Sequence, residues 1–226
     1  MSQLPVYAVY TQSHEALVRE FFLPSLPGDV DLRLSIYDVD GPGNFLDDGF
    51  IRTIRHKLDL IIESVDQNEG KVIVWTDVDI QFFDSFVEPV QQLTSHFDLC
   101  CQTETFVNGD VNTGFIALRC CGDTRYFFER VRTMAVKSGR NEQPVVNELR
   151  DTGQTEGLSI GRFSHPFYAA THGPPPEDIV LHHANDTAPQ EHKSSLQLKL
   201  EQLQRVRNLR GHPLEPYHGP ITHSNE

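Results

Sequence analysis

Hydrophobic residues in this chain of 226 residues gather in short runs, separated by longer stretches with helical periodicity. Residues 6–10 form a mostly apolar run, and apolar and polar positions alternate over residues 32–36, as in a half-buried strand. Residues 72–75 (VIVW) are apolar throughout, which is typical of a buried central strand in a mostly parallel sheet. Further strands are predicted in four ranges: 97–101, 114–119, 158–163 and 178–181.

Apolar residues spaced three and four positions apart predict helices between these strands. The clearest series consists of Phe50, Ile54, Leu58, Ile61 and Val65. An earlier series, which Ser13 could cap, consists of Leu17, Val18, Phe21 and Phe22. A C-terminal series consists of Leu196, Leu200, Leu203, Val206 and Leu209. Two more helices are predicted over residues 124–137 and 143–150, and the Gly-Pro-Gly sequence at 41–43 predicts a loop.

Strands that alternate with helices in this way predict an α/β fold with helices flanking a mostly parallel central sheet. The length suits one domain, and a hydrophobic fraction of 38% is enough for a packed core. We expect a single domain over residues 1–210. Residues 211–226 are rich in proline, histidine and glycine, and we expect them to form a flexible tail.

The formal net charge of −13 disfavours nucleic acid and anionic lipid as partners, because such a surface repels phosphate groups. No apolar run is long enough to span a bilayer, and the N-terminus lacks the pattern of a signal peptide. The four cysteines form two vicinal pairs, Cys100-Cys101 and Cys120-Cys121, each in a predicted strand. Neighbours in a strand face opposite ways, so we expect reduced thiols and a cytoplasmic protein.

Two carboxylates, Asp77 and Asp79, follow the apolar run 72–75. Ligands of open α/β sheets bind at the carboxyl ends of the strands, and side chains two positions apart in an extended segment point the same way. Such a pair can hold a hard divalent cation such as Mn²⁺ or Mg²⁺. A solvated acidic turn is the alternative, but the apolar segments on both sides would make an unpaired double charge costly to desolvate.

Four segments in this order resemble the GT-A glycosyltransferases, and more narrowly the nucleotide-diphospho-sugar transferases related to glycogenin and to the xylosyltransferases. They are Lys57, the W-T-D-V-D-I sequence at 75–80, the V-N-T-G-F-I-A-L-R sequence at 111–119, and H-H-A-N at 182–185 followed by Lys193. The likeness spans about residues 5–205. It implies a GT-A, Rossmann-like fold.

The resemblance also implies a set of site residues. The metal ligands would be Asp77, Asp79 and a late histidine, His183 or its neighbour His182; the H-A-N pattern favours His183. The implied donor-binding residues are Tyr10, Thr11, Ser13, Lys57, Asp77 and Lys193, with Lys193 on the diphosphate. The implied catalytic residues near the donor sugar are Asn112, Glu142 and Gln143, although relatives often carry Asp where Glu142 stands.

Structural alternatives remain open for several of these residues. Lys57 is one position off the apolar stripe of its helix, as a solvated lysine would be, and Asn112, which follows a turn-like segment, could be a turn residue. Glu142 can simply complement a helix dipole, and Gly114 permits a close backbone approach to any neighbour.

The function implied by the resemblance is metal-dependent transfer of a sugar, with retention, from a nucleotide-diphosphate sugar to a glycan or other hydroxyl acceptor. The favoured donor is a UDP-sugar, and the implied cofactor is Mn²⁺ or Mg²⁺. One alternative is a sugar nucleotidyltransferase, but residues 11–15 (TQSHE) lack the glycine-rich, basic phosphate loop of that class. A second alternative is a non-catalytic, metal-dependent carbohydrate- or nucleotide-binding domain, and a third is hydrolysis of the donor by water.

Overall fold

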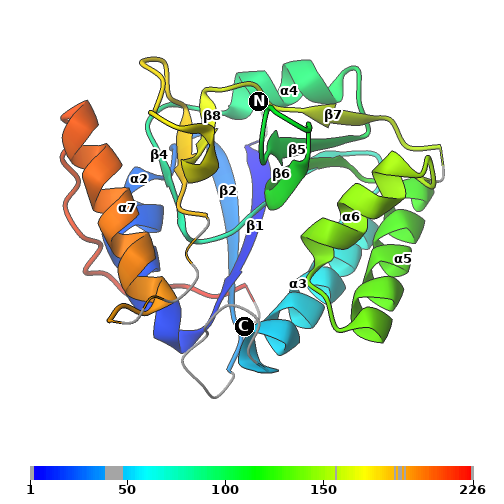
Figure 1. The fold of residues 1–226 in the computed structure, drawn as a ribbon, viewed down its shortest axis with the longest axis horizontal. Helices are drawn as coiled ribbons and strands as arrows, with labels where there is room; N and C mark the ends of the chain where they lie inside the picture. Colours follow the sequence, from blue (N-terminus) through cyan, green and yellow to red (C-terminus); the bar gives the residue numbers. More distant parts are fainter. Residues whose placement is uncertain are drawn as a thin grey trace.

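The computed structural model describes residues 3–38, 48–155, 157–185, 187, 190 and 192–224. A six-stranded sheet runs through the middle of the molecule in the order β2-β1-β3-β6-β5-β7 (Figure 1). Its strands are β1 (Leu4–Tyr10), β2 (Val30–Ile36), β3 (Val72–Thr76), β5 (Leu99–Thr103), β6 (Val111–Arg119) and β7 (Ile160–Arg162). Each strand that the sequence predicts in this sheet is therefore present.

Five of these six strands run in the same direction. β1 pairs in parallel with β2 and β3, and β5 pairs in parallel with β7. β6 is antiparallel to both of its neighbours, β3 and β5. This mixed but mostly parallel sheet, with helices on its faces, confirms the predicted fold class. Its β1 and β3 strands end at the same edge, where the Asp77-Asp79 segment begins.

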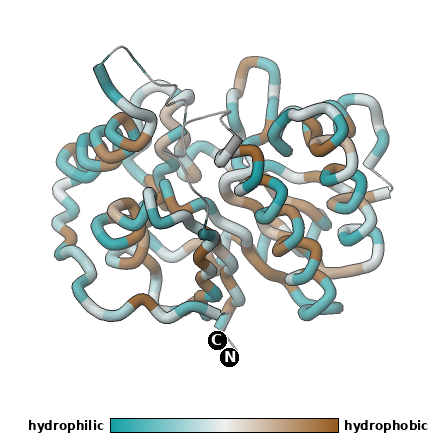
Figure 2. Tube along the Cα trace, turned by 90° about the horizontal axis from the view of Figure 1, so that it is seen from below, coloured by the Kyte–Doolittle hydropathy of each residue, from teal (hydrophilic) through white to brown (hydrophobic). Residues whose placement is uncertain are grey.

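Three helices cover one face of the sheet: α3 (Asp48–Gln67), α5 (Gly122–Ser138) and α6 (Glu142–Asp151) (Figure 1). The periodic side chains of α3 pack against Trp75 and Ile116 of the sheet, and Leu58 and Val65 are completely buried. Figure 2 shows hydrophobic and hydrophilic positions alternating along these helices, as expected for elements with one face on the core.

The other face carries a second, smaller sheet in the order β4-β9-β8, formed by β4 (Ile80–Phe82), β9 (Leu181–His183) and β8 (Phe167–Ala169). The N-terminal helical segments are η1 (Gln12–His14), α1 (Glu15–Leu17), η2 (Val18–Phe22) and α2 (Leu23–Ser25), and Phe22 of η2 packs against Phe82 of β4. The helix α4 (Val87–Thr94) packs against β5 and β6. Phe82, Phe86 and Phe115 form an aromatic cluster between the two sheets. This cluster holds β4 and β9 over the end of β3.

The last helix, α7 (Ser195–Arg210), lies across the N-terminal helices (Figure 1). It begins at the N-cap Ser194, whose hydroxyl accepts from the Gln197 amide, and it ends at Gly211 with a φ of 58°. Leu203 and Val206 are buried, as predicted, but Leu209 is 66% exposed. The following residues turn back beside α7 and end below β1 and β2.

Two local predictions are wrong. Ser13 does not cap a helix: the segment starts with a 3-10 turn, and the Ser13 hydroxyl bonds to the Thr11 and His14 side chains. Cys120 and Cys121 follow β6 instead of lying in it, because the strand gives way to α5. All four cysteines are free thiols. The 41–43 loop and the side chain of Phe50 lie outside the described residues.

Within the described part of the chain, no helix combines the length and the apolar character that crossing a membrane requires.

Candidate metal and donor site

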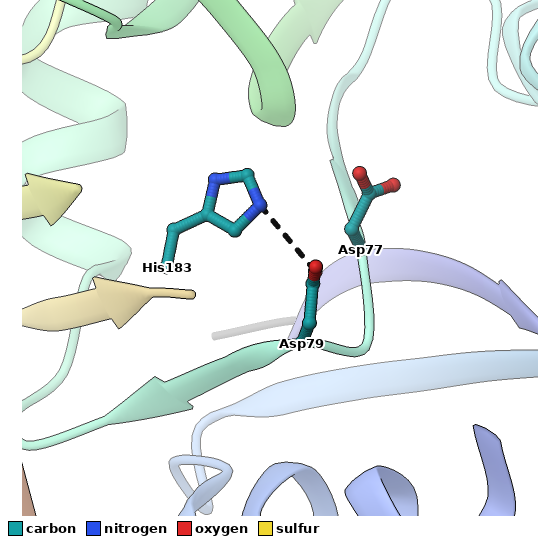
Figure 3. A group of neighbouring side chains, drawn as sticks. All are labelled: Asp77, Asp79 and His183. Atoms are coloured by element: carbon teal, nitrogen blue, oxygen red, sulfur yellow. Dashed lines mark ion pairs between the residues drawn. The ribbon is translucent and has the colours of Figure 1, made fainter. Parts of the chain in front are cut away.

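Asp77, Asp79 and His183 converge at the edge where β3 passes into β4 (Figure 3). Backbone bonds fix both aspartates: the Asp77 N–H donates to the Gly114 carbonyl at 2.6 Å, and the Asp79 carbonyl accepts from Ala184 at 3.0 Å. His183 reaches the same point from the end of β9, which pairs with β4. One ligand atom from each of the three side chains lies within 4.8 Å of the other two. The structure thus brings together the three ligands that the resemblance implies.

Gln102, at the end of β5, sets the orientation of the His183 ring. The Gln102 Nε2 group donates to the Phe167 carbonyl at 3.1 Å, which leaves Gln102 Oε1 to accept from His183 Nδ1 at 2.9 Å. In the neutral ring the proton is then on Nδ1 and the lone pair is on Nε2, and His183 Nε2 lies 3.4 Å from Asp79 Oδ1. Asp79 Oδ1 is buried and has no hydrogen-bond partner among the described residues. With Nε2 unprotonated, two acceptors face each other in a buried site, and a metal ion between them would satisfy both; a proton on Nε2 would instead make this contact the ion pair drawn in Figure 3.

Gly114 lets the imidazole approach the sheet. The β5–β6 register jumps from Cys101–Ile116 to Gln102–Asn112, so residues 113–115 of β6 lie outside this ladder. At this irregularity a Cβ on Gly114 would lie 2.9 Å from His183 Nδ1 and 2.9 Å from Asn112 Oδ1, and closer still to His183 Cε1. The glycine expected to permit a close approach therefore makes room for His183.

Lys57 of α3 is buried beneath the two aspartates. Its ammonium lies 2.8 Å from Asp77 Oδ1 and 2.8 Å from Glu142 Oε1, and it donates to the Thr113 carbonyl at 3.1 Å. Burial disfavours the charged ammonium, but the carboxylates of Asp77 and Glu142 outweigh this effect and raise the pKa of Lys57. The alternative of a solvated lysine is wrong, since the residue is only 3% exposed.

The ammonium group beside Asp79 belongs to Lys199, a residue that was not predicted from the sequence. Its ammonium contacts Asp79 Oδ2 from α7. Burial would raise the pKa of Asp79, but the ammonium of Lys199 outweighs burial and holds it well below its ordinary value. The predicted phosphate lysine, Lys193, instead pairs with Glu201 at 2.7 Å on an exposed part of the surface. The sequence does contain a signal for Lys199: it is spaced three residues from Leu196 and four from Leu203, so it lies on the inward-facing side of α7.

Two adjoining cavities meet at this cluster. The smaller, of about 140 Å³, lies beside the end of β1 and is lined in part by Tyr10, Thr11, Thr53 and Ser195. The larger, of about 420 Å³, opens between β6, α6 and the segment after β9. Asp77, Asp79 and Lys199 line both cavities.

The predicted sugar-side residues Asn112, Glu142 and Gln143 all line the larger cavity. Asn112 has both ends of its amide engaged, because Nδ2 donates to Glu104 and Oδ1 accepts from Gly114. Glu104, which follows β5, was not identified from the sequence, and it also lines this cavity. Asn185 donates to both of its carboxylate oxygens at 3.1 Å, so the two asparagines fix Glu104 in place.

Two other predicted residues lie apart from the cluster. The His182 ring bonds through Nδ1 to Gln81 at 3.1 Å and packs against Tyr168 on the far side of β9. Burial, with a smaller effect of His183, lowers the pKa of His182 to about 3, so this ring is neutral. Ser13 does not line either cavity and bonds to the Thr11 side chain.

The charges of the described residues that line the two cavities fit a divalent cation. There are four carboxylates, Asp77, Asp79, Glu104 and Glu142, and two ammonium groups, Lys57 and Lys199. Four minus two leaves an excess of two negative charges. Two carboxylates with an imidazole nitrogen form a ligand set that suits Mn²⁺ and Mg²⁺.

No protein-family model matches the chain, and no curated protein sequence matches it. Solved structures do share its fold. The glycosyltransferase GlyE of Streptococcus pneumoniae TIGR4 is 11% identical, with a TM-score of 0.57, over 98% of this chain and 67% of GlyE. The galactosyltransferase LgtC, solved with donor and acceptor sugar analogs, is 11% identical, with a TM-score of 0.55, over 92% of this chain and 95% of LgtC.

A third similar structure is a glycosyltransferase involved in the glycosylation of the major capsid of PBCV-1. It is 11% identical, with a TM-score of 0.56, over 89% of this chain and 99% of its own. At this identity the likeness concerns the fold. The chain has the GT-A fold of glycosyltransferases, as its sequence motifs predict, and carries a possible D-x-D-type metal site at the expected edge of the sheet.

Proposed function

We propose that this protein is a metal-dependent glycosyltransferase that moves a sugar from a nucleotide-diphosphate sugar to a hydroxyl group of a glycan or other acceptor. The observation that carries the proposal is the Asp77-Asp79-His183 cluster at the junction of two cavities, where Asp79 Oδ1 is buried and accepts no hydrogen bond from the described residues. A UDP-sugar as donor and retention of configuration are supported by the sequence resemblance alone.

The two cavities suit the two ends of such a donor. The smaller cavity, beside β1, would hold the nucleoside, and the larger cavity, lined by Glu104 and Gln143, would hold the sugar and the acceptor hydroxyl. The diphosphate would then lie between them, against Lys199 and the first turn of α7. There the Ser195 hydroxyl is buried and has no partner among the described residues, so it can donate to a phosphate oxygen.

Mn²⁺ or Mg²⁺, held by Asp77, Asp79 and His183, would neutralise the diphosphate and stabilise it as a leaving group. The chain's own residues supply position and charge. Lys57, itself paired with Glu142, fixes Asp77, and Gln102 fixes His183. Lys199 is the ammonium placed to stabilise the charge that develops on the diphosphate as the bond to the sugar breaks.

The proposal can be tested by measuring release of the nucleoside diphosphate from the donor. The acceptor need not be known, because water can slowly take its place and accept the sugar. UDP-, GDP-, dTDP- and CDP-sugars would each be incubated with the protein, with and without Mn²⁺. We expect release from one class of donor that requires the metal and falls about 100-fold or more in Asp79→Asn. Release by Asp79→Asn at the rate of the unaltered protein would refute the proposal.

A further inference from the structure

Residues 217–224, called here the C-terminal strap, bind to three separate parts of the fold beside the smaller cavity. The Tyr217 N–H donates to the Arg19 carbonyl at 2.8 Å, and the Arg19 guanidinium donates back to the carbonyls of Tyr217 at 3.3 Å and Gly219 at 2.9 Å. The Ser224 N–H donates to the Leu34 carbonyl of β2 at 2.9 Å. These bonds join the strap to η2 at one end and to β2 at the other.

Between these anchors the strap reaches Tyr10. The His223 Nε2 atom and the Tyr10 hydroxyl share a hydrogen bond of 3.0 Å, and the two rings stack with centroids 5.9 Å apart and planes 30° apart. Ile221 packs against the same hydrophobic cluster that contains Tyr10. With the strap in place Tyr10 is only 3% exposed, although it is the last residue of β1.

Tyr10 also lines the smaller cavity, together with its neighbours Val9 and Thr11. Its ring is therefore bounded by the cavity and by the strap. A side chain held at its hydroxyl and its ring face keeps a single rotamer, and a cavity wall fixed in this way binds its ligand without an ordering cost. The bond to His223 provides this fixation across 213 residues of chain.

We propose that the C-terminal strap is a positioning element of the donor site, in which His223 fixes Tyr10 and thereby sets the affinity for the nucleoside end of a nucleoside diphosphate. This inference rests on the proposed function, since it takes the smaller cavity as the nucleoside site. His223 acts through Tyr10 and is a positioning residue. The strap thus extends the donor site to a segment that the sequence alone assigned to a flexible tail.

His223→Ala tests the inference, and His218→Ala is its matched control, because His218 is an exposed histidine of the same strap. Binding of UDP, GDP, dTDP and CDP would be measured by calorimetry in the presence of Mn²⁺. For the nucleotide that binds, we expect His223→Ala to weaken the affinity about fivefold, the equivalent of one lost hydrogen bond. We expect His218→Ala to bind as the unaltered protein does.

Two further variants separate positioning from general stability. Tyr10→Phe keeps the ring but removes the hydroxyl, and it should weaken binding to the same extent as His223→Ala, with no further loss in the double variant. His223→Asn, which keeps a polar group at this position, should recover part of the affinity. In turnover, His223→Ala should raise the KM for the donor and leave kcat within about twofold.

The outcomes distinguish this inference from the proposed function. If the unaltered protein binds none of the four nucleotides, the proposed function and the strap inference both fail. If it binds one of them and His223→Ala binds it equally well, the strap inference fails and the proposed function stands. Equal losses in His223→Ala and His218→Ala would also overturn the inference, because the effect would then not pass through Tyr10.

Discussion

Replacing Gly114 with alanine puts a methyl group where the imidazole of His183 now packs. The new Cβ would lie 2.9 Å from His183 Nδ1, whereas ordinary contacts begin at 3.4 Å. The ring must therefore move by at least about 0.5 Å, since 3.4 minus 2.9 is 0.5. Metal–ligand distances tolerate only about 0.2 Å, so this displacement is enough to spoil the ligand geometry.

We expect Gly114→Ala to weaken Mn²⁺ binding about 10- to 100-fold, the range found when the support of a metal ligand is altered. The added methyl group also overpacks the core and should lower the free energy of unfolding by about 1–3 kcal/mol. For a chain of this length that corresponds to a fall in Tm of roughly 2–12 °C. Calorimetric titration with Mn²⁺ and a thermal melt measure the two effects separately.

Gly122→Ala is the matched control, because nothing lies within 4 Å of the Cβ that it would add. It should leave both Mn²⁺ affinity and Tm unchanged within about 0.5 kcal/mol. A folded Gly114→Ala protein that binds Mn²⁺ as tightly as the unaltered protein would refute the argument that Gly114 makes room for a metal-binding His183.

Four other changes give direct tests. Gln102→Leu should reduce Mn²⁺ affinity about 10- to 100-fold, because His183 loses its orienting acceptor. Lys199→Ala should lower kcat/KM for the donor about 100-fold, whereas Lys193→Ala should stay within about twofold, as measured by nucleotide release. Lys57→Met should lower the free energy of unfolding by about 3–5 kcal/mol in chemical denaturation, because two carboxylates lose their buried cation. Iodoacetamide at pH 8 should label Cys121 before the other three thiols, as mass spectrometry of the native protein can show.

These predictions can fail in different ways. Equal losses in Lys199→Ala and Lys193→Ala would mean that the contact between Lys199 and Asp79 does not set the role of Lys199. A Lys57→Met variant as stable as the unaltered protein would show that the buried carboxylates are neutral or solvated. The labelling prediction rests on burial, which raises the pKa of Cys100 and Cys120 to about 12. Uniform labelling of all four thiols in the native state would contradict it.

The elements with strong local patterns could be predicted from the sequence. The apolar run 72–75 forms β3, as predicted, because a segment that is apolar on both faces is buried in the middle of a sheet. The periodic apolar residues over 54–65 lie in α3, also as predicted. Asp77 and Asp79 could be singled out as candidate metal ligands because two carboxylates follow a buried strand. In these cases the information lies within about ten consecutive residues.

Contacts between distant segments could not be predicted in this way. Lys199 meets Asp79 across 120 residues, and the packing of α7 on the N-terminal helices decides which face of α7 turns toward the cavity. Gln102 reaches His183 because the β5–β6 register shifts at that residue, and no local signal marks such an irregularity. Nor does anything in the composition of residues 211–226 predict the bond between His223 and Tyr10.

Thermal stability in the presence of nucleotides tests the central claim most directly. The melting temperature would be measured with UDP-, GDP-, dTDP- and CDP-sugars, each with and without Mn²⁺, for the unaltered protein and for Asp79→Asn. At about 100 times its dissociation constant, the donor should stabilise the unaltered protein by roughly 2.7 kcal/mol, a rise in Tm of about 5–11 °C. We predict that one class of nucleotide produces this rise, only with Mn²⁺ and not in Asp79→Asn. No rise with any nucleotide, or an equal rise in Asp79→Asn, would contradict the assignment of Asp77, Asp79 and His183 as a metal-dependent donor site.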